Sequence, residues 1–249
     1  MAFPATSGAL STRMPGARAT LILVHGAWHG PWCWDVLTAH LQAHAVAVQC
    51  VALPSAASAV PAGLAEDAAA VSEVLSRVSG AVVLCGHSYG GMVVSAADTR
   101  QADVRRLVYL CAYLTEAGES VEASLRAAGE RRPGHWIRRL SDGRMQVDAE
   151  RAAARLYADC PAATQEWAIA RLRPQWGQGL GQSTACPAWR RHPSTYVVCS
   201  EDRALAPSIQ REVYGVRAQQ VLTLASGHCP FLSQPRQLAQ LLAGLAQLS

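Results

Sequence analysis

The feature that most constrains this chain is the pentapeptide Gly86-His87-Ser88-Tyr89-Gly90. The apolar run before it, at 81–85, predicts a buried strand, and the small and apolar residues from 91 to 99 predict a helix. In a Gly-x-Ser-x-Gly turn between a strand and a helix, the serine adopts strained backbone angles, while the glycines let strand and helix approach closely. We therefore expect the Ser88 hydroxyl to stand clear of the sheet, near a helix N-terminus that favours developing negative charge. A serine in an ordinary glycine-rich turn would explain the pentapeptide, but it would not explain the predicted strand before it and the predicted helix after it.

A serine hydroxyl becomes a good nucleophile only when a base removes its proton, so a histidine and an acid must be sought elsewhere. Residues 194–199 predict a buried strand, and the carboxylates that follow it make Asp202 the expected acid. Residues 219–224 predict another strand, and the short loop after it carries His228, the expected base. The order serine, acid, histidine is one of the three familiar orders of a catalytic triad.

An oxyanion hole needs two backbone N–H groups aimed at the substrate carbonyl oxygen. The residue after the nucleophile, Tyr89, should supply one of them. The second should come from the loop after the first predicted strand, at 19–24, where Gly26 lets the backbone turn inward and the N–H of Ala27 becomes the expected donor.

Two histidines of this loop, His25 and His29, have the spacing of a metal-binding pair. Gly26, Gly30 and Pro31 argue against the helix that would bring them to one face. We therefore expect no metal site, and we expect His25 to bind backbone groups beneath the active site.

The loop Leu23-Val24-His25-Gly26-Ala27-Trp28-His29-Gly30-Pro31-Trp32 and the elbow at 86–91 together resemble the α/β-hydrolases. Over nearly its whole length the chain is similar to the branch that contains small methyl-ester and pyrethroid esterases and plant hydroxynitrile lyases. The resemblance implies Ser88 as nucleophile, Asp202 as acid, His228 as base, and Ala27 and Tyr89 as oxyanion donors, which agrees with the reasoning from the residues.

Three positions separate the esterases from the lyases within that branch. The lyases carry threonine at the position of Gly26, glutamate at that of His87, and lysine at that of Cys229. The resemblance therefore implies an esterase and disfavours a cyanohydrin lyase.

The chain alternates predicted strands and helices, which is typical of a parallel sheet covered on both faces. We expect an α/β-hydrolase fold with about six mainly parallel strands and a helical cap. The predicted boundaries are a flexible leader at 1–18, a core at 19–115 and 187–249, and a cap at 116–186. Aromatic residues of the cap and of nearby loops predict an apolar substrate pocket, and the candidates are Trp28, Tyr113, Trp136, Trp167 and Trp176.

Composition narrows the class further. All 22 basic residues are arginine, so chemistry that depends on a lysine, such as Schiff-base or Walker-type phosphate chemistry, has no support, and we expect no cofactor. The net charge of +4 is scattered, which argues against nucleic acid as a partner, although an arginine of the middle region could recognise an acidic group on the substrate. The eight cysteines lie mostly in or beside apolar strands, as free thiols do in a reducing compartment.

The first eighteen residues lack the apolar stretch of a secretory signal, and no apolar run is long enough to span a membrane. We therefore expect a cytoplasmic protein whose partner is a small ester-like molecule, and the sequence leaves a homodimer open.

These observations predict a serine esterase that acts on a small to medium apolar or aromatic substrate through an acyl-enzyme. A thioesterase, lactonase or acyltransferase would use the same residues. A ligand-binding protein built on a hydrolase fold is the alternative from a different class.

Overall fold

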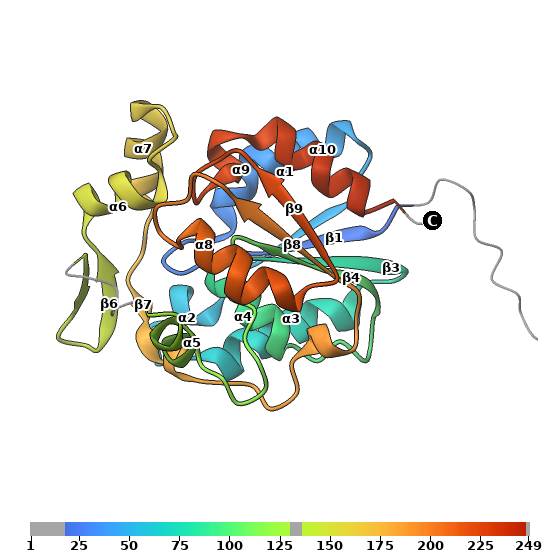
Figure 1. Ribbon diagram of the computed structural model, residues 1–249, viewed down its shortest axis with the longest axis horizontal. Coiled ribbons are helices and arrows are strands. Elements are labelled where there is room, and N and C mark those ends of the chain that lie inside the picture. Colours follow the sequence, from blue (N-terminus) through green and yellow to red (C-terminus); the bar gives the residue numbers. More distant parts are fainter. Residues whose placement is uncertain (1–17, 130–135, 248–249) are drawn as a thin grey trace, which may run out of the picture.

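The structure, a computed structural model, describes residues 18–129 and 136–247. At its centre lies a sheet of six parallel strands in the order β2-β1-β3-β4-β8-β9 (Figure 1). The strands are β1 (Thr20–Val24), β2 (Val48–Val51), β3 (Ala81–His87), β4 (Asp103–Leu110), β8 (Ser194–Cys199) and β9 (Gln220–Leu224). The predicted α/β class and the six parallel strands are confirmed.

Alternate side chains of β1 pack against opposite layers, as the two-residue period of a strand requires. Leu21 and Leu23 belong to the apolar cluster that contains the helices α1 (Asp35–Ala43) and α10 (Pro235–Leu245). Ile22 and Val24 belong to the cluster that contains α3 (Leu64–Arg77) and α4 (Tyr89–Ala96). Helices thus cover both faces of the sheet, with α1 and α10 on one side and α3 and α4 on the other (Figure 1).

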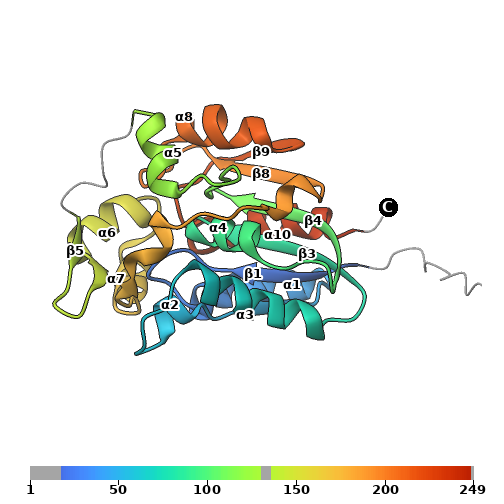
Figure 2. The same cartoon turned by 90° about the horizontal axis from the view of Figure 1, so that it is seen from below.

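The chain between β4 and β8 adds no strand to the central sheet within its described part. Its helices and strands are α5 (Val121–Ala127), β5 (Ile137–Arg139), β6 (Arg144–Val147), α6 (Ala149–Leu156), α7 (Ala162–Ile169) and β7 (Gln175–Trp176). Much of this segment lies beyond the carboxyl ends of the central strands (Figure 2). We keep the name cap for residues 116–186, with the boundaries proposed from the sequence.

The cap contains a small antiparallel sheet, β5-β6-β7, besides its helices. The sequence predicted only short helices and turns there. These strands have two to four residues each, which is too short for an alternating pattern to stand out.

The remaining helices are short and lie between these elements. They are α2 (Pro54–Ala57), α8 (Pro207–Ile209), α9 (Pro230–Ser233) and the 3-10 helices at Pro31–Trp34, Gly177–Gly181, Ala188–Arg190 and Gly215–Arg217, together with a π turn at Gln210–Tyr214. Among the described helices, none combines the length and apolar character needed to cross a membrane. The predicted leader falls outside the described residues except for Arg18, which forms a bridge with Gln247.

Candidate active site

The turn between β3 and α4 has the elbow geometry expected from its sequence. Ser88 adopts φ 51° and ψ −120°, a positive φ that is strained for any residue with a Cβ. The flanking glycines are required by close packing, because a Cβ on Gly86 would lie 2.5 Å from the Gly90 carbonyl oxygen, and one on Gly90 would lie 2.5 Å from that of Val24. The elbow therefore presents a half-buried Ser88 at the carboxyl end of the sheet.

The loops after β8 and β9 bring Asp202 and His228 together. The Nδ1 of His228 lies 2.7 Å from Oδ2 of Asp202, and both residues are buried. Because a carboxylate can only accept, Nδ1 carries the hydrogen and Nε2 remains free to act as a base. The acid and the base predicted from the sequence are therefore hydrogen-bonded partners.

Asp202 is held by groups close to it in the sequence. Its Oδ1 accepts from the backbone N–H groups of Ala204 at 2.7 Å and Leu205 at 2.9 Å, while Oδ2 also accepts from Nε2 of Gln210 at 2.8 Å. Gln210 is fully buried, and its Oε1 accepts from the N–H of Cys199. The sequence analysis did not identify Gln210, because a glutamine in a helical turn carries no motif.

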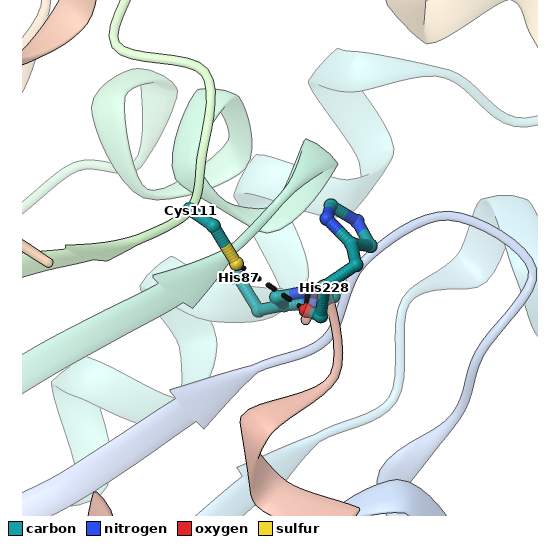
Figure 3. Close-up of side chains that lie close together, drawn as sticks. All are labelled: His87, Cys111 and His228. Atoms are coloured by element: carbon teal, nitrogen blue, oxygen red, sulfur yellow. Dashed lines mark hydrogen bonds between the residues drawn. The ribbon is translucent and has the colours of Figure 1, made fainter. Parts of the chain in front are cut away.

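His87 supports the loop that carries His228. Its Nε2–H donates to the carbonyl oxygen of His228 at 2.9 Å, and the thiol of Cys111 donates to the same oxygen at 3.3 Å (Figure 3). One nitrogen or sulfur of each of these three residues lies within 4.8 Å of the others, so their spacing would suit a metal ion. Their hydrogen bonds instead hold the backbone of His228, while its ring points away from the Cys111 sulfur (Figure 3).

The loop after β1, residues 25–29, carries the predicted oxyanion donor and is called the oxyanion loop below. Its Ala27 N–H has no hydrogen-bond partner among the described residues, whereas the N–H of Trp28 donates to Oε1 of Gln175 at 2.6 Å. Trp28 adopts a positive φ of 63°. The N–H of Ala27 therefore stays the predicted oxyanion donor of this loop.

The two histidines of the oxyanion loop are hydrogen-bonded to backbone groups. His25 donates from Nδ1 to the Gly26 carbonyl at 2.9 Å and accepts the N–H of Leu53 on Nε2, which confirms its expected role beneath the site. His29 donates from Nδ1 to the Ala27 carbonyl at 2.8 Å. Burial lowers the pKa of His25 to about 4 and that of His29 to about 3, so both rings are neutral at physiological pH.

A cavity of about 900 Å³ lies between the core and the cap, and Ser88 and His228 both line it. Of the predicted pocket aromatics, Trp28, Tyr113, Trp136 and Trp176 also line it. Trp167 is not among the lining residues, because its ring packs against that of Trp32 at 5.3 Å and beneath the guanidinium of Arg171 at 4.3 Å. The aromatic wall of the cavity is thus built from both the cap and the core.

Charged residues also reach this cavity. Arg126, Arg139 and Arg155 of the cap line it together with Glu122. The guanidinium of Arg155 lies 5.6 Å from the centre of the Trp136 ring. The two cysteines whose roles the sequence left open, Cys33 and Cys229, are fully buried and do not line the cavity.

Comparison with known proteins gives the same family. The model of the alpha/beta hydrolase family matches residues 21–241. The alpha/beta hydrolase nvfD of Aspergillus novofumigatus is 28% identical, with 92% of this chain and 97% of that protein covered. Methyl jasmonate esterase 1 of Vitis vinifera is 26% identical, with 91% and 96% covered. The crystal structure of a pyrethroid hydrolase from Sphingobium faniae superimposes with a TM-score of 0.79 at 25% identity, covering 92% of this chain and 97% of that one. On fold, site geometry and family match, this chain belongs to the alpha/beta hydrolase family.

Proposed function

We propose that the protein is a serine esterase that cleaves carboxylic esters of small to medium apolar or aromatic molecules. One observation carries the proposal: His228, hydrogen-bonded to the buried Asp202, lines the same cavity as Ser88. A base oriented by a carboxylate and a serine on a strained elbow are the parts that acyl transfer requires. The esterases among the similar proteins support the same reaction class.

In the proposed mechanism, Nε2 of His228 takes the proton from Ser88 Oγ while Oγ attacks the ester carbonyl. The backbone N–H groups of Ala27 and Tyr89 stabilise the oxyanion, and Asp202 stabilises the imidazolium that forms. The imidazolium returns the proton to the alcohol that leaves, and an acyl-serine ester remains. Water then repeats these steps, releasing the carboxylic acid and free Ser88.

The cavity supports the proposed substrate class. Its four predicted aromatics, Trp28, Tyr113, Trp136 and Trp176, suit an apolar or aromatic group. Recognition of an acidic group by a cap arginine stays a prediction, as do the cytoplasmic location and the absence of a cofactor.

Labelling with a fluorophosphonate tests the proposal directly, because the probe reacts only with an activated serine. We expect one label per chain at Ser88, and hydrolysis of activated esters that falls about a millionfold in Ser88→Ala. The exposed Ser76→Ala, on α3, is the matched control and should keep full activity. An unlabelled protein, or a Ser88→Ala variant with normal turnover, would rule out the esterase and favour a ligand-binding protein.

Thioesterase, lactonase and acyltransferase activity remain the alternatives within the same chemistry. An ester and a thioester with the same acyl group, each offered with and without an acceptor alcohol, separate them. We expect the ester to be hydrolysed fastest and the alcohol to leave the product unchanged.

A further inference from the structure

Every polar group of Trp28 is bound by a residue of the cap. Its N–H donates to Oε1 of Gln175 at 2.6 Å, its carbonyl accepts from the N–H of Arg173 at 3.0 Å, and its indole N–H donates to the carbonyl of Met145 at 3.2 Å. A bulky residue at a positive φ keeps that conformation only when its surroundings impose it. The conformation of the oxyanion loop therefore depends on the cap.

The peptide groups on both sides of the Ala27 Cα are held by hydrogen bonds. The Gly26–Ala27 peptide, which contains this N–H, is held through its carbonyl by His25. The Ala27–Trp28 peptide is held at its N–H by Gln175 and at its carbonyl by His29. Because peptide units are planar, two fixed planes leave Ala27 little freedom to turn its N–H away.

A cap residue also holds His29. The Nε2 of His29 accepts the hydroxyl hydrogen of Tyr157 at 2.8 Å, because Nδ1 of the same ring is the donor to the Ala27 carbonyl. Tyr157 is fully buried. The cap thus reaches the oxyanion loop through the backbone of Trp28 and, separately, through the ring of His29.

Gln175 is connected to the second proposed donor as well. Its Nε2 donates to Oγ of Ser55 at 2.8 Å, and Ser55 Oγ donates in turn to Oδ2 of Asp67 at 2.6 Å. The phenol of Tyr89 donates to the same carboxylate oxygen at 2.8 Å. Gln175 is 5% exposed and Asp67 is fully buried, so this network lies inside the protein. One cap side chain thus connects the backbone of Trp28, the residue after the proposed donor Ala27, with the side chain of Tyr89, the other proposed donor.

We propose that Gln175 is a positioning residue that holds the oxyanion hole in its active geometry. It acts through Trp28 on one donor and through Ser55, Asp67 and Tyr89 on the other. The proposal rests on the esterase function above and adds that the cap is required for the chemical step, besides shaping the substrate cavity.

The test is Gln175→Leu, which keeps a similar volume and removes both hydrogen bonds. Losing one oxyanion donor outright typically lowers kcat by about 100- to 1000-fold, so misplacing donors that are still present should lower it by about 10- to 100-fold. KM should stay within about threefold, because donors aimed at the transition state contribute little to ground-state binding. The matched control is Gln146→Leu, since Gln146 lies on the same small cap sheet and its side chain accepts a hydrogen bond from Arg138, which is also in the cap.

Inhibitor binding separates positioning from general damage to the cavity. A trifluoromethyl ketone that forms an oxyanion on Ser88 should bind Gln175→Leu at least tenfold more weakly than wild type. The corresponding alcohol, which forms no oxyanion, should bind both proteins equally. Because the Asp202–His228 pair is held elsewhere, the pH profile of kcat/KM should keep its shape.

The proposal fails if folded Gln175→Leu keeps wild-type kcat, or if ketone and alcohol lose affinity equally. Should Gln175→Leu not fold, Gln175→Met decides, because it keeps the unbranched shape of the side chain and removes the hydrogen bonds to Trp28 and Ser55. Its kcat should fall about 10- to 100-fold with KM within about threefold, and an unchanged kcat would overturn the proposal. Fluorophosphonate labelling of wild-type Ser88 distinguishes failure of the esterase proposal from failure of the Gln175 proposal. If wild-type Ser88 is not labelled, the esterase function is excluded. If it is labelled, the Gln175 variant tests only the positioning role.

Discussion

The two sides of the active site are held in different ways. On the acid-base side, which consists of Asp202, His228 and Gln210, the partners of the carboxylate other than His228 lie within eight residues of it in the chain. On the oxyanion side, which consists of residues 25–29, the partners of Trp28 lie more than 100 residues away, in the cap. The loop of the histidine has one cap contact of its own, from the Gly227 N–H to Asp159.

The two sides therefore differ in which parts of the chain must fold before their hydrogen bonds can form. Contacts between neighbours in sequence form at little cost in chain entropy, whereas contacts across 117 and 147 residues require the whole cap to be in place. The acid and its orienting groups are therefore a property of the core. On the proposal above, the Ala27 donor becomes ordered only when cap and core dock. Substitutions on the two sides should consequently differ in their effects on kcat, on stability and on binding of the ketone relative to the alcohol.

Among variants that distinguish the two sides, the largest effect should come from Asp202→Asn, on the acid-base side. An amide there disfavours the tautomer of His228 that leaves Nε2 as the base, and in serine proteases the same change lowers kcat by about 10⁴-fold. We expect a loss of that order in steady-state assays, with the alcohol analogue bound as in wild type. A loss below about tenfold would mean that another group orients His228.

A smaller effect should come from acid, which acts on the buried histidines of the oxyanion side. The folded pKa values, about 4 for His25 and about 3 for His29, lie below the unfolded value of 6.5. The unfolded chain therefore binds more protons below pH 6.5, and stability falls as the pH drops from there toward about 4 and about 3. At pH 5 each histidine should lower the free energy of unfolding by about 2 kcal/mol. Urea unfolding at pH 7.5 and at pH 5 measures this difference.

The variant His29→Gln supplies the control for that measurement. It removes one of the two titrating rings, so the difference in stability between the two pH values should shrink. An unchanged difference would show that acid acts through other groups.

The smallest effect should come from Gln210→Leu, the acid-base counterpart of Gln175→Leu. The change removes one of the donors to Asp202 and leaves the buried N–H of Cys199 without its partner. We expect kcat to fall about tenfold and stability by about 1–3 kcal/mol, because a buried donor is left unsatisfied. Binding of the ketone relative to the alcohol should change less than in Gln175→Leu, and the exposed Gln219→Leu should behave as wild type. An equal loss of ketone binding in both glutamine variants would remove the distinction between the two sides.

The core of the fold could be predicted from the sequence because its signals are local. The elbow, the six strands and the pairing of Asp202 with His228 all follow from short motifs or from continuous apolar runs. The π turn that carries Gln210 and the short strands of the cap have no comparable pattern. The sequence predicts that Trp167 lines the cavity, but its ring packs against Trp32. The residue type alone does not distinguish these two environments.

The role proposed for Gln175 is invisible in the sequence for a physical reason. Its partners Trp28 and Ser55 lie 147 and 120 residues away, so only the folded chain reveals them. His87 is a similar case, because it belongs to the elbow motif but binds the backbone of His228, 141 residues later. Both residues connect segments that no local pattern relates.

The three hydrogen bonds from the cap to Trp28 limit how the cap can be replaced by protein engineering. Grafting the lid of another hydrolase onto this core would change substrate range and, at the same time, remove the hydrogen-bonding groups that keep the tryptophan in its unusual conformation. A productive chimera would have to bring a carbonyl for the indole, an acceptor for the amide and a donor for the carbonyl. On the role proposed for Gln175, replacing the cap would also change the rate of the chemical step, so new specificity should be sought at cap positions that leave those bonds intact.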